Sequence, residues 1–302
     1  MISKLAEDYL SHLAFERRLA DLTIQHYRRD LDLLDELVGT LGGSSSLSTL
    51  QQADIRRFIA QLHGKGLSAK SLARLLSAWR GFFEYARRNA HLAHNPAEGV
   101  RAPKFARRLP EVLAPDEACK LVAIDDDTPW GKRDRALFEL AYSCGLRVSE
   151  LVGVDIDALD LRAGEVRVTG KGAKTRIVPV GGPALAAIAR WLEVRKDLPG
   201  ANLSALFLGP RGTRLSVRLV QTRIKMWATR QGITQDLHPH MLRHSFASHV
   251  LQSSGDLRAV QEMLGHASIA STQVYTHLDF QHLAKVYDAA HPRAKRKGNS
   301  RT

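Results

Sequence analysis

The chain has 302 residues, of which 44% are hydrophobic, and this length and composition exclude disordered and fibrous proteins and leave room for two domains. Lys and Arg number 44 against 31 Asp and Glu, so the formal net charge of +13 predicts a polyanionic partner, with nucleic acid as the first candidate. No apolar run reaches the roughly 18 residues that a membrane span needs, and the acidic Glu7 and Asp8 near the start do not fit a signal peptide. We therefore expect a cytoplasmic protein with no membrane insertion.

The first hundred residues, 1–100, predict an all-helical domain. Apolar side chains recur there at the three- and four-residue spacing of a helix with one buried face: Ile24, Tyr27, Leu31, Leu34 and Leu37; Ile55, Phe58, Ile59 and Leu62; Leu72, Leu75, Leu76, Trp79, Phe82 and Phe83. We expect about four helices in this domain. Arginine pairs such as Arg28 with Arg29 lie on the polar faces, where they either contact phosphates or are simply solvated.

A short basic segment, 101–110, comes next. It lies between prolines and has four basic side chains and no acid, which predicts an interdomain linker. Its basic residues suit contact with a DNA backbone: Arg101, Lys104, Arg107 and Arg108. A solvated linker whose charges only aid solubility explains them equally well. A second basic segment, 286–302, has five basic side chains and one acid.

Residues 111–285 predict a second domain that combines helices with a little β-structure. Apolar residues alternate in two short runs, which predicts a β-hairpin: Val166 and Val168, then Ile177, Val178 and Val180. A glycine-rich basic tip, 170–174, joins the two strands. Helical spacing covers 134–141 before the hairpin and resumes after it. The expected fold is thus mainly α-helical with a small β-sheet or hairpin.

The densest polar run is 238–244, which opens a predicted helix. His240 and Arg243 share one face of that helix, where the helix dipole and the planar guanidinium both favour a phosphate. Zinc is the alternative, because His240 and His244 have the spacing of an HExxH motif, but the Glu is missing and no third ligand suggests itself. The two cysteines, Cys119 and Cys144, form no CxxC pair. We expect no metal.

Two further clusters carry polar residues at helix boundaries. In the first, Gly145 ends one helix and Arg147 opens the next, with Glu150 one turn on, where it either holds the guanidinium in place or forms an ordinary surface ion pair. In the second, Gly265 predicts the end of a helix and Tyr275 lies one turn into the following one. A tyrosine in that position is normally a core residue.

Six residues, in this order and with these neighbours, resemble the catalytic set of the tyrosine site-specific recombinase (integrase) family: Arg147, Lys171, His240, Arg243, His266 and Tyr275. The resemblance covers nearly the whole chain. It implies a SAM-like helical domain that binds the core DNA site over 1–100, the linker over 101–110 and a catalytic domain over 111–285. Residues 276–294 are similar to the XerC branch of the family.

The resemblance implies that Tyr275 attacks the scissile phosphate, leaving a 3′-phosphotyrosyl link and a free 5′-hydroxyl. A phenol with a pKa near 10 lies about three units above neutrality, and each unit corresponds to about 1.36 kcal/mol, so the site must assist its ionisation. Arg147 and Arg243 would hold the nonbridging oxygens and stabilise charge in the transition state.

The other matched residues would handle protons and supporting contacts. By resemblance, Lys171 would protonate the leaving 5′ oxygen, and His240 would act in proton transfer with the nucleophile. His266 would hydrogen-bond the phosphate, and Glu150 would support Arg147. One phosphodiester replaces another of similar energy, so the resemblance implies no cofactor, metal or nucleotide, and the sequence contains no P-loop.

For the XerC branch, the implied partners are a double-stranded DNA recombination site, a XerD-type recombinase in a heterotetramer and a DNA translocase of the division machinery. The implied role is to resolve chromosome and plasmid dimers for segregation at cell division. In the family, a helix near the C-terminus docks into the neighbouring protomer, so 286–302 is either such a docking segment or a disordered basic tail.

Three alternatives stay open on the sequence alone. A phage, transposon or integron integrase, or a type IB topoisomerase-like enzyme, uses the same six side chains. A sequence-specific DNA-binding protein without catalysis needs only the helical domain and the basic linker, with Tyr275 as a core residue. A metal-dependent nuclease would use His240 and His244.

Overall fold

A computed structural model of the chain describes residues 2–41, 47–89, 92–104, 112–170, 174–265 and 285–294. The chain divides into two compact units, Met1–Arg107 and Arg108–Thr302, and the division falls within the predicted linker. Each unit has its own hydrophobic core. Within the described ranges, no helix is long and apolar enough to cross a membrane.

The N-terminal unit is helical, as the spacing of its apolar residues predicts. Its described part contains α1 (Ile2–Phe15), α2 (Asp21–Gly39), α3 (Gln52–Gly64) and α4 (Ala69–Asn89). The predicted apolar faces of the last three meet in one core, in which Leu34, Phe58 and Trp79 are fully buried. The Trp79 indole donates to the carbonyl of Asp30 at 2.7 Å, which joins α4 to α2.

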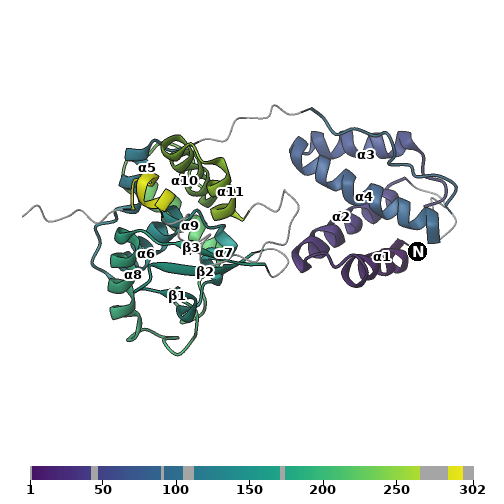
Figure 1. The fold of residues 1–302 in the computed structure, drawn as a ribbon. Coiled ribbons are helices and arrows are strands. Elements are labelled where there is room, and N and C mark those ends of the chain that lie inside the picture. The colour runs from purple at the N-terminus through teal and green to yellow at the C-terminus, as the bar shows by residue number, and fades with distance from the viewer. Residues whose placement is uncertain are drawn as a thin grey trace, which may run out of the picture. The chain divides into compact units, whose positions relative to one another are not determined.

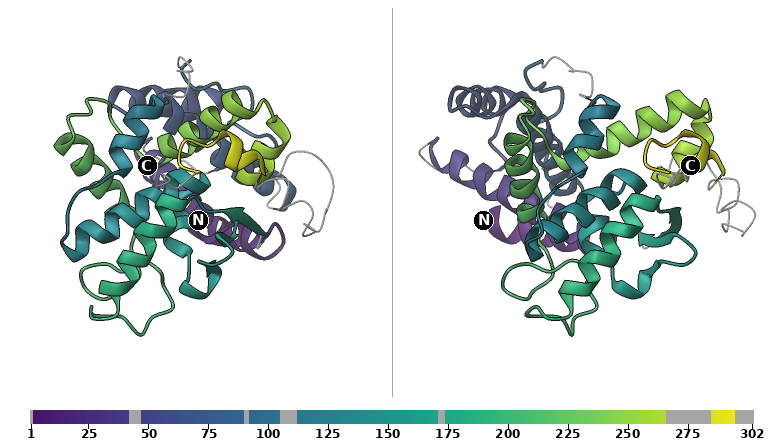
Figure 2. Two further views of the ribbon diagram at one scale, coloured as in Figure 1. Left: turned by 60° about the vertical axis from the view of Figure 1, so that its left-hand side comes forward. Right: turned by 90° about the vertical axis from the view of Figure 1, so that its left-hand side faces the viewer.

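Helices also make up most of the second unit. They are α5 (Pro115–Val122), α6 (Pro129–Cys144), α7 (Val148–Gly153), the 3-10 turn η1 (Ile156–Ala158), α8 (Gly182–Arg195), α9 (Val217–Arg230), α10 (Pro239–Ser254) and α11 (Leu257–Leu264). The central helix is α6, which packs against α5, α8 and α10 and is buried along most of its length (Figures 1 and 2).

A buried polar network fixes α6 to α9. Asp134 has no exposed surface, and its carboxylate accepts hydrogen bonds from Arg133, from Arg223 and, at 2.8 Å, from the Trp227 indole. Since Arg133 is itself only 1% exposed, the two buried charges compensate each other.

A three-stranded antiparallel sheet lies beside these helices, in the order β1 (Leu159–Asp160), β2 (Glu165–Thr169) and β3 (Thr175–Pro179). β2 and β3 confirm the predicted hairpin, whereas the two-residue β1 was not predicted. Val166 and Val168 on β2 face the core, and the register places Val168 opposite Arg176 on β3. The predicted fold class, mainly helical with a small sheet, is confirmed.

The C-terminal residues 285–294 pack against the second unit of the same chain. Residues 285–290 are helical and lie beside α10, in yellow in Figures 1 and 2. Tyr287 is 1% exposed, with its hydroxyl 2.5 Å from the Ser143 Oγ, and His291 stacks on its ring at 4.8 Å. Arg293 pairs with the buried carboxylate of Glu139. Residues 295–302 of the predicted tail lie outside the described residues, and docking of the tail onto a neighbouring protomer stays a prediction.

Candidate active site

The site starts at the junction between α6 and α7. Gly145 ends α6 with φ of 57°, a left-handed conformation that glycine adopts without a Cβ penalty, and an added Cβ would lie 2.4 Å from the Phe246 ring. Arg147 is the N-cap of α7. Its backbone N–H donates to Glu150 Oε2 at 2.8 Å, and its Nη1 donates to Glu150 Oε1 at 2.8 Å. The structure therefore contains the contact that the three-residue spacing predicts.

Glu150 is the common partner of three arginines. Its side chain is 2% exposed, and Arg176 donates to both carboxylate oxygens at 2.9 Å. Arg243 Nη1 lies 3.8 Å from Glu150 Oε2. Burial alone would raise the pKa of Glu150, but the hydrogen bonds from Arg176 and Arg147 outweigh burial and hold that pKa at about 2. Glu150 is thus a permanent anion at neutral pH.

The same three arginines hold the C-terminal end of α11. Arg176 Nε donates to the carbonyl of Met263 at 2.9 Å, and Arg243 Nη2 donates to the carbonyl of Leu264 at 2.6 Å. Arg147 Nη2 lies 3.5 Å from the carbonyl of Gly265. The last carbonyls of a helix have no partner within it and carry the negative end of its dipole, which is why cations bind there. Three consecutive carbonyls are therefore held by three different arginines.

Positive charge exceeds negative charge in this cluster, since Glu150 balances only one of the three guanidiniums. Burial lowers the pKa of Arg243 to about 10, and the neighbouring charges of Arg147 and Arg176 also lower it. Because a pKa of about 10 is still well above 7, Arg243 stays protonated at neutral pH. Arg243 Nη1 also donates to the Gly145 carbonyl at 2.7 Å. The side chain of Arg147 is 37% exposed and gives the cluster its access to solvent. The arrangement suits an oxyanion such as a phosphate.

The interpretation of the sequence missed Arg176, although a signal was present. Side chains in a strand alternate between faces, so Arg176 shares its face with Val178, which the alternation already assigned to the core. Arg176 is 6% exposed, while Ile177, one of the apolar positions of the predicted hairpin, is 42% exposed. A buried arginine needs acceptors such as a carboxylate or backbone carbonyls, and Arg176 has the carboxylate of Glu150 and the carbonyl of Met263.

Histidines line the start of α10. His238 is the N-cap, and His240 lies in the first turn, with the two rings 6.2 Å apart. Burial lowers the pKa of His244, and the neighbouring His240, His238 and Arg243 lower it further, so His244 is neutral at pH 7. In the part of the chain that the structure describes, no group of three or more His, Cys, Asp or Glu is arranged to hold a metal ion.

Several predicted site residues lie outside the described residues: Lys171, His266, Tyr275, Arg107 and Arg108. Two described glycines adjoin them in sequence, because Gly170 directly precedes Lys171 and Gly265 directly precedes His266. Arg101 and Lys104 are exposed and lie in a stretch without regular secondary structure. The catalytic and DNA-binding roles of all these residues stay predictions.

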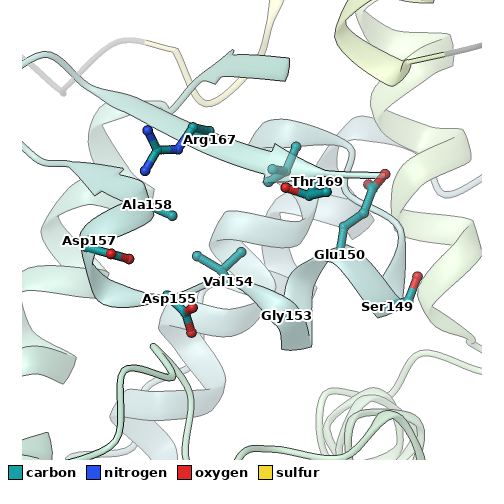
Figure 3. A pocket seen from close by; sticks show the side chains of 10 residues that line it. Ser149, Glu150, Gly153, Val154, Asp155, Asp157, Ala158, Arg167 and Thr169 are labelled. Carbon is teal, nitrogen blue, oxygen red and sulfur yellow. The ribbon is translucent and has the colours of Figure 1, made fainter. Parts of the chain in front are cut away.

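A pocket of about 270 Å³ adjoins the cluster, between α7, η1 and β2 (Figure 3). Glu150, which pairs with Arg147 and Arg176, and Thr169 lie near one another at one end of the pocket, and Arg167 lines the pocket from β2. Asp155 and Asp157 also line it, and their charges disfavour a phosphate there. The arginine cluster therefore suits a phosphate better than this pocket does.

Comparison with known proteins gives the family. The family model described as the phage integrase family matches residues 111–282, and the model described as the phage integrase N-terminal SAM-like domain matches residues 6–90. The chain is 54% identical over 307 residues to tyrosine recombinase XerC 1 of Ralstonia nicotianae, covering 96% of this chain and 93% of that one. It is 52% identical over 299 residues to the tyrosine recombinase XerC of Xylella fastidiosa, covering 98% and 99%.

Among solved structures, the XerH site-specific recombinase bound to a palindromic difH substrate has a TM-score of 0.70 at 24% identity, covering 90% of this chain and 81% of that one, and so shares its fold. The chain belongs to the phage integrase family of tyrosine site-specific recombinases, and it is a DNA recombinase. Within the family it is similar to the XerC recombinases. The predicted family is confirmed, and membership favours an enzyme over a DNA-binding protein without catalysis.

Proposed function

We propose that this recombinase cuts and rejoins DNA strands through a covalent bond between Tyr275 and a 3′ phosphate, with Arg147 and Arg243 binding the nonbridging oxygens. The observation that carries the proposal is the arginine cluster. Arg147 and Arg243 converge on Glu150 from two different elements, α7 and α10, and the cluster keeps excess positive charge beside solvent. A scissile phosphate would supply the missing negative charge.

The proposed step balances as a transesterification. The Tyr275 oxygen bonds to phosphorus as the bond from phosphorus to the 5′ oxygen breaks. The phenol loses its proton with the help of His240, and the leaving 5′ oxygen gains one from Lys171. His266 donates a hydrogen bond to the phosphate. Reversal of the step by another 5′-hydroxyl rejoins the strands, and bond energy is conserved without a nucleotide.

A nicked duplex carrying a candidate recombination site tests the proposal. The purified protein, without metal or ATP and with EDTA in excess, should form a protein–DNA adduct that survives a denaturing gel. Tyr275→Phe should bind the same DNA and form no adduct. An adduct that persists in the Phe variant would assign the nucleophile elsewhere, and activity lost in EDTA would favour the metal-dependent nuclease.

We propose further that the cellular role is the resolution of chromosome and plasmid dimers, together with a XerD-type recombinase in a heterotetramer and with a DNA translocase. Identity of 52–54% to XerC recombinases over nearly the whole chain supports this role. An adduct that forms, or forms faster, only when a XerD-type partner is added would support the heterotetramer. Full recombination by this chain alone would favour an integrase acting as a homotetramer.

A further inference from the structure

We propose that Arg176 is a positioning residue for DNA cleavage, which holds Glu150 and the C-terminal end of α11 so that Arg147 and Arg243 bind the same phosphate. The inference rests on the proposed function, because it concerns the same arginine cluster. It adds a residue from β3 that belongs to none of the six matched positions.

Arg176 acts through other residues and does not contact DNA itself. Its three guanidinium nitrogens all donate within the protein: Nε to the carbonyl of Met263, Nη1 to Glu150 Oε1 and Nη2 to Glu150 Oε2, each at 2.9 Å. The residue is 6% exposed. Since each of its three nitrogens donates within the protein and the residue is covered, a bound phosphate would meet the more exposed Arg147 and not Arg176.

The contacts of Arg176 link the elements that carry the site. Glu150, which it grips with two parallel bonds, in turn accepts both the backbone N–H and the Nη1 of Arg147. Met263, whose carbonyl it holds, is followed by Leu264, whose carbonyl accepts from Arg243. Displacement of Arg176 would therefore move the partners of both phosphate-binding arginines at once.

Close packing leaves this arrangement little freedom. A Cβ on Gly265 would lie 3.1 Å from Arg176 Cδ and Nη1, in a backbone conformation with φ of 62°. A Cβ on Gly170 would lie 3.3 Å from Glu150 Oε1. Gly265 directly precedes His266, and Gly170 directly precedes Lys171. Arg176 therefore packs on the residue before His266, and Glu150 packs on the residue before Lys171.

Two substitutions separate the charge of Arg176 from its geometry. Arg176→Gln removes both the charge and the planar guanidinium. Arg176→Lys keeps the charge but lacks the planar group that donates to both oxygens of Glu150. We expect the single-turnover rate of adduct formation to fall about tenfold to a hundredfold in both, because small misplacements of catalytic groups cost rates of this order. The dissociation constant for DNA should change by less than about threefold, since Arg176 does not touch it.

The pH profile provides a readout that lost stability alone would not move. Without Arg176, burial favours the neutral acid of Glu150, so the acid limb of the rate profile should shift to higher pH in Arg176→Gln. In Arg176→Lys the retained charge should bring the limb back toward that of the wild type while the rate stays low. If the acid limb of the rate profile lies at the same pH in the wild type and in Arg176→Gln, the proposal is overturned.

Arg195 provides a matched control. It is 3% exposed and lies on α8, and its guanidinium donates to the backbone carbonyls of Ala201, Leu203 and Ala205. Arg195→Gln also removes a buried guanidinium, so it should lower the melting temperature and leave the rate and the pH profile of the folded fraction unchanged. An equal loss of rate in Arg195→Gln would mean that any buried arginine has the same effect, which contradicts a positioning role.

Hydrogen exchange followed by mass spectrometry tests the proposal without the reaction. In Arg176→Gln, exchange should speed up in peptides from α7 and from the end of α11, and in Arg195→Gln it should speed up in 197–206 instead. Unchanged exchange in α11 would overturn the proposal. A wild type that forms no adduct would count against the proposed function alone, and exchange would still decide whether Arg176 holds the two elements. A wild type that forms the adduct at the same rate as Arg176→Gln would overturn the positioning role alone.

Discussion

Arg243 donates to the carbonyl of Leu264 at 2.6 Å, and this bond joins α10 to the last turn of α11. Nη1 of the same guanidinium donates to the carbonyl of Gly145 at 2.7 Å and lies 3.8 Å from Glu150 Oε2. One side chain of α10 thus contacts the end of α6, Glu150 on α7 and the last turn of α11.

We expect Arg243→Lys to slow adduct formation by about a hundredfold to a thousandfold, the usual effect of removing one preorganised donor at a site of developing charge. Lysine keeps the charge but cannot donate to Gly145, Leu264 and a phosphate from one planar group. Single-turnover cleavage of the nicked duplex measures the rate, and a melting curve verifies that the variant is folded. A rate within threefold of the wild type would remove Arg243 from transition-state stabilisation.

Most of the fold could be predicted from the sequence. A helix or strand that buries one face has apolar residues that recur with the period of that structure. The faces that include Leu34, Phe58 and Trp79 are in the core as predicted. The short β1 carries no readable period, since two residues cannot alternate. It forms because β2 offers it a free edge.

The site was only partly predictable, for a physical reason. Arg147 and Glu150 lie three residues apart at the start of α7, so their contact follows from local spacing. The contacts of Arg243 with Leu264 and of Arg176 with Met263 join residues that are distant in sequence, and they use backbone carbonyls, which every residue has. No side-chain pattern marks such acceptors.

Glu150 should make the stability of the second unit depend on pH. Its pKa of about 2 in the folded chain lies below its ordinary value of 4.5, so its contribution is complete above pH 4.5 and is lost as the pH falls toward 2. The difference corresponds to about 3 kcal/mol. Glu150→Gln should be less stable at neutral pH by about 3–5 kcal/mol, because Arg176 is left buried without its carboxylate.

Urea unfolding of the wild type and of Glu150→Gln between pH 7 and pH 3 measures this effect. The difference between their free energies of unfolding should be constant near neutrality and should shrink below pH 4.5. Glu193→Gln, at an exposed position on α8, is the control and should show no such narrowing. A constant difference down to pH 3 would contradict the predicted link between Glu150 and acid stability.

The buried network around Asp134 should be a main source of stability for the second unit. Asp134→Asn presents an amide N–H to the donors of Arg223 and Trp227 and leaves Arg133 buried without a countercharge, so we expect a loss of about 3–5 kcal/mol. Trp227→Phe removes one hydrogen bond to Asp134 and part of a buried ring that Arg230 covers, but it leaves every charge in place and should cost less, about 1–3 kcal/mol. Denaturant unfolding gives the free energy of unfolding of both variants. Equal losses in Asp134→Asn and Trp227→Phe would show that the charge of Asp134 adds no stability beyond one hydrogen bond.

The basic linker should make DNA binding steeply dependent on salt. Each phosphate contact contributes about −0.9 to the slope of log K against log salt, so replacing four contacting residues by glutamine should flatten the slope by about 3–4. The residues to replace are Arg101, Lys104, Arg107 and Arg108. Fluorescence anisotropy between 50 and 200 mM salt gives the slope. An unchanged slope would support the alternative in which these charges only aid solubility.

Lys171 should act as the acid that protonates the leaving 5′ oxygen. Lys171→Ala is expected to slow adduct formation by about a hundredfold to ten-thousandfold, the range that general acid catalysis contributes. A substrate with sulfur in place of the bridging 5′ oxygen leaves as a thiolate, which needs no proton because thiols ionise near pH 8.5. Cleavage of that substrate by Lys171→Ala should therefore approach the wild-type rate.

The same sulfur substrate distinguishes the acid from a phosphate-binding residue. Arg243→Lys should stay slow on it, because sulfur in the leaving group does not replace a contact to the nonbridging oxygens. If Lys171→Ala is as slow on the sulfur substrate as on ordinary DNA, the lysine does not donate the proton. Its effect would then have to come from contact with the phosphate, as for the arginines.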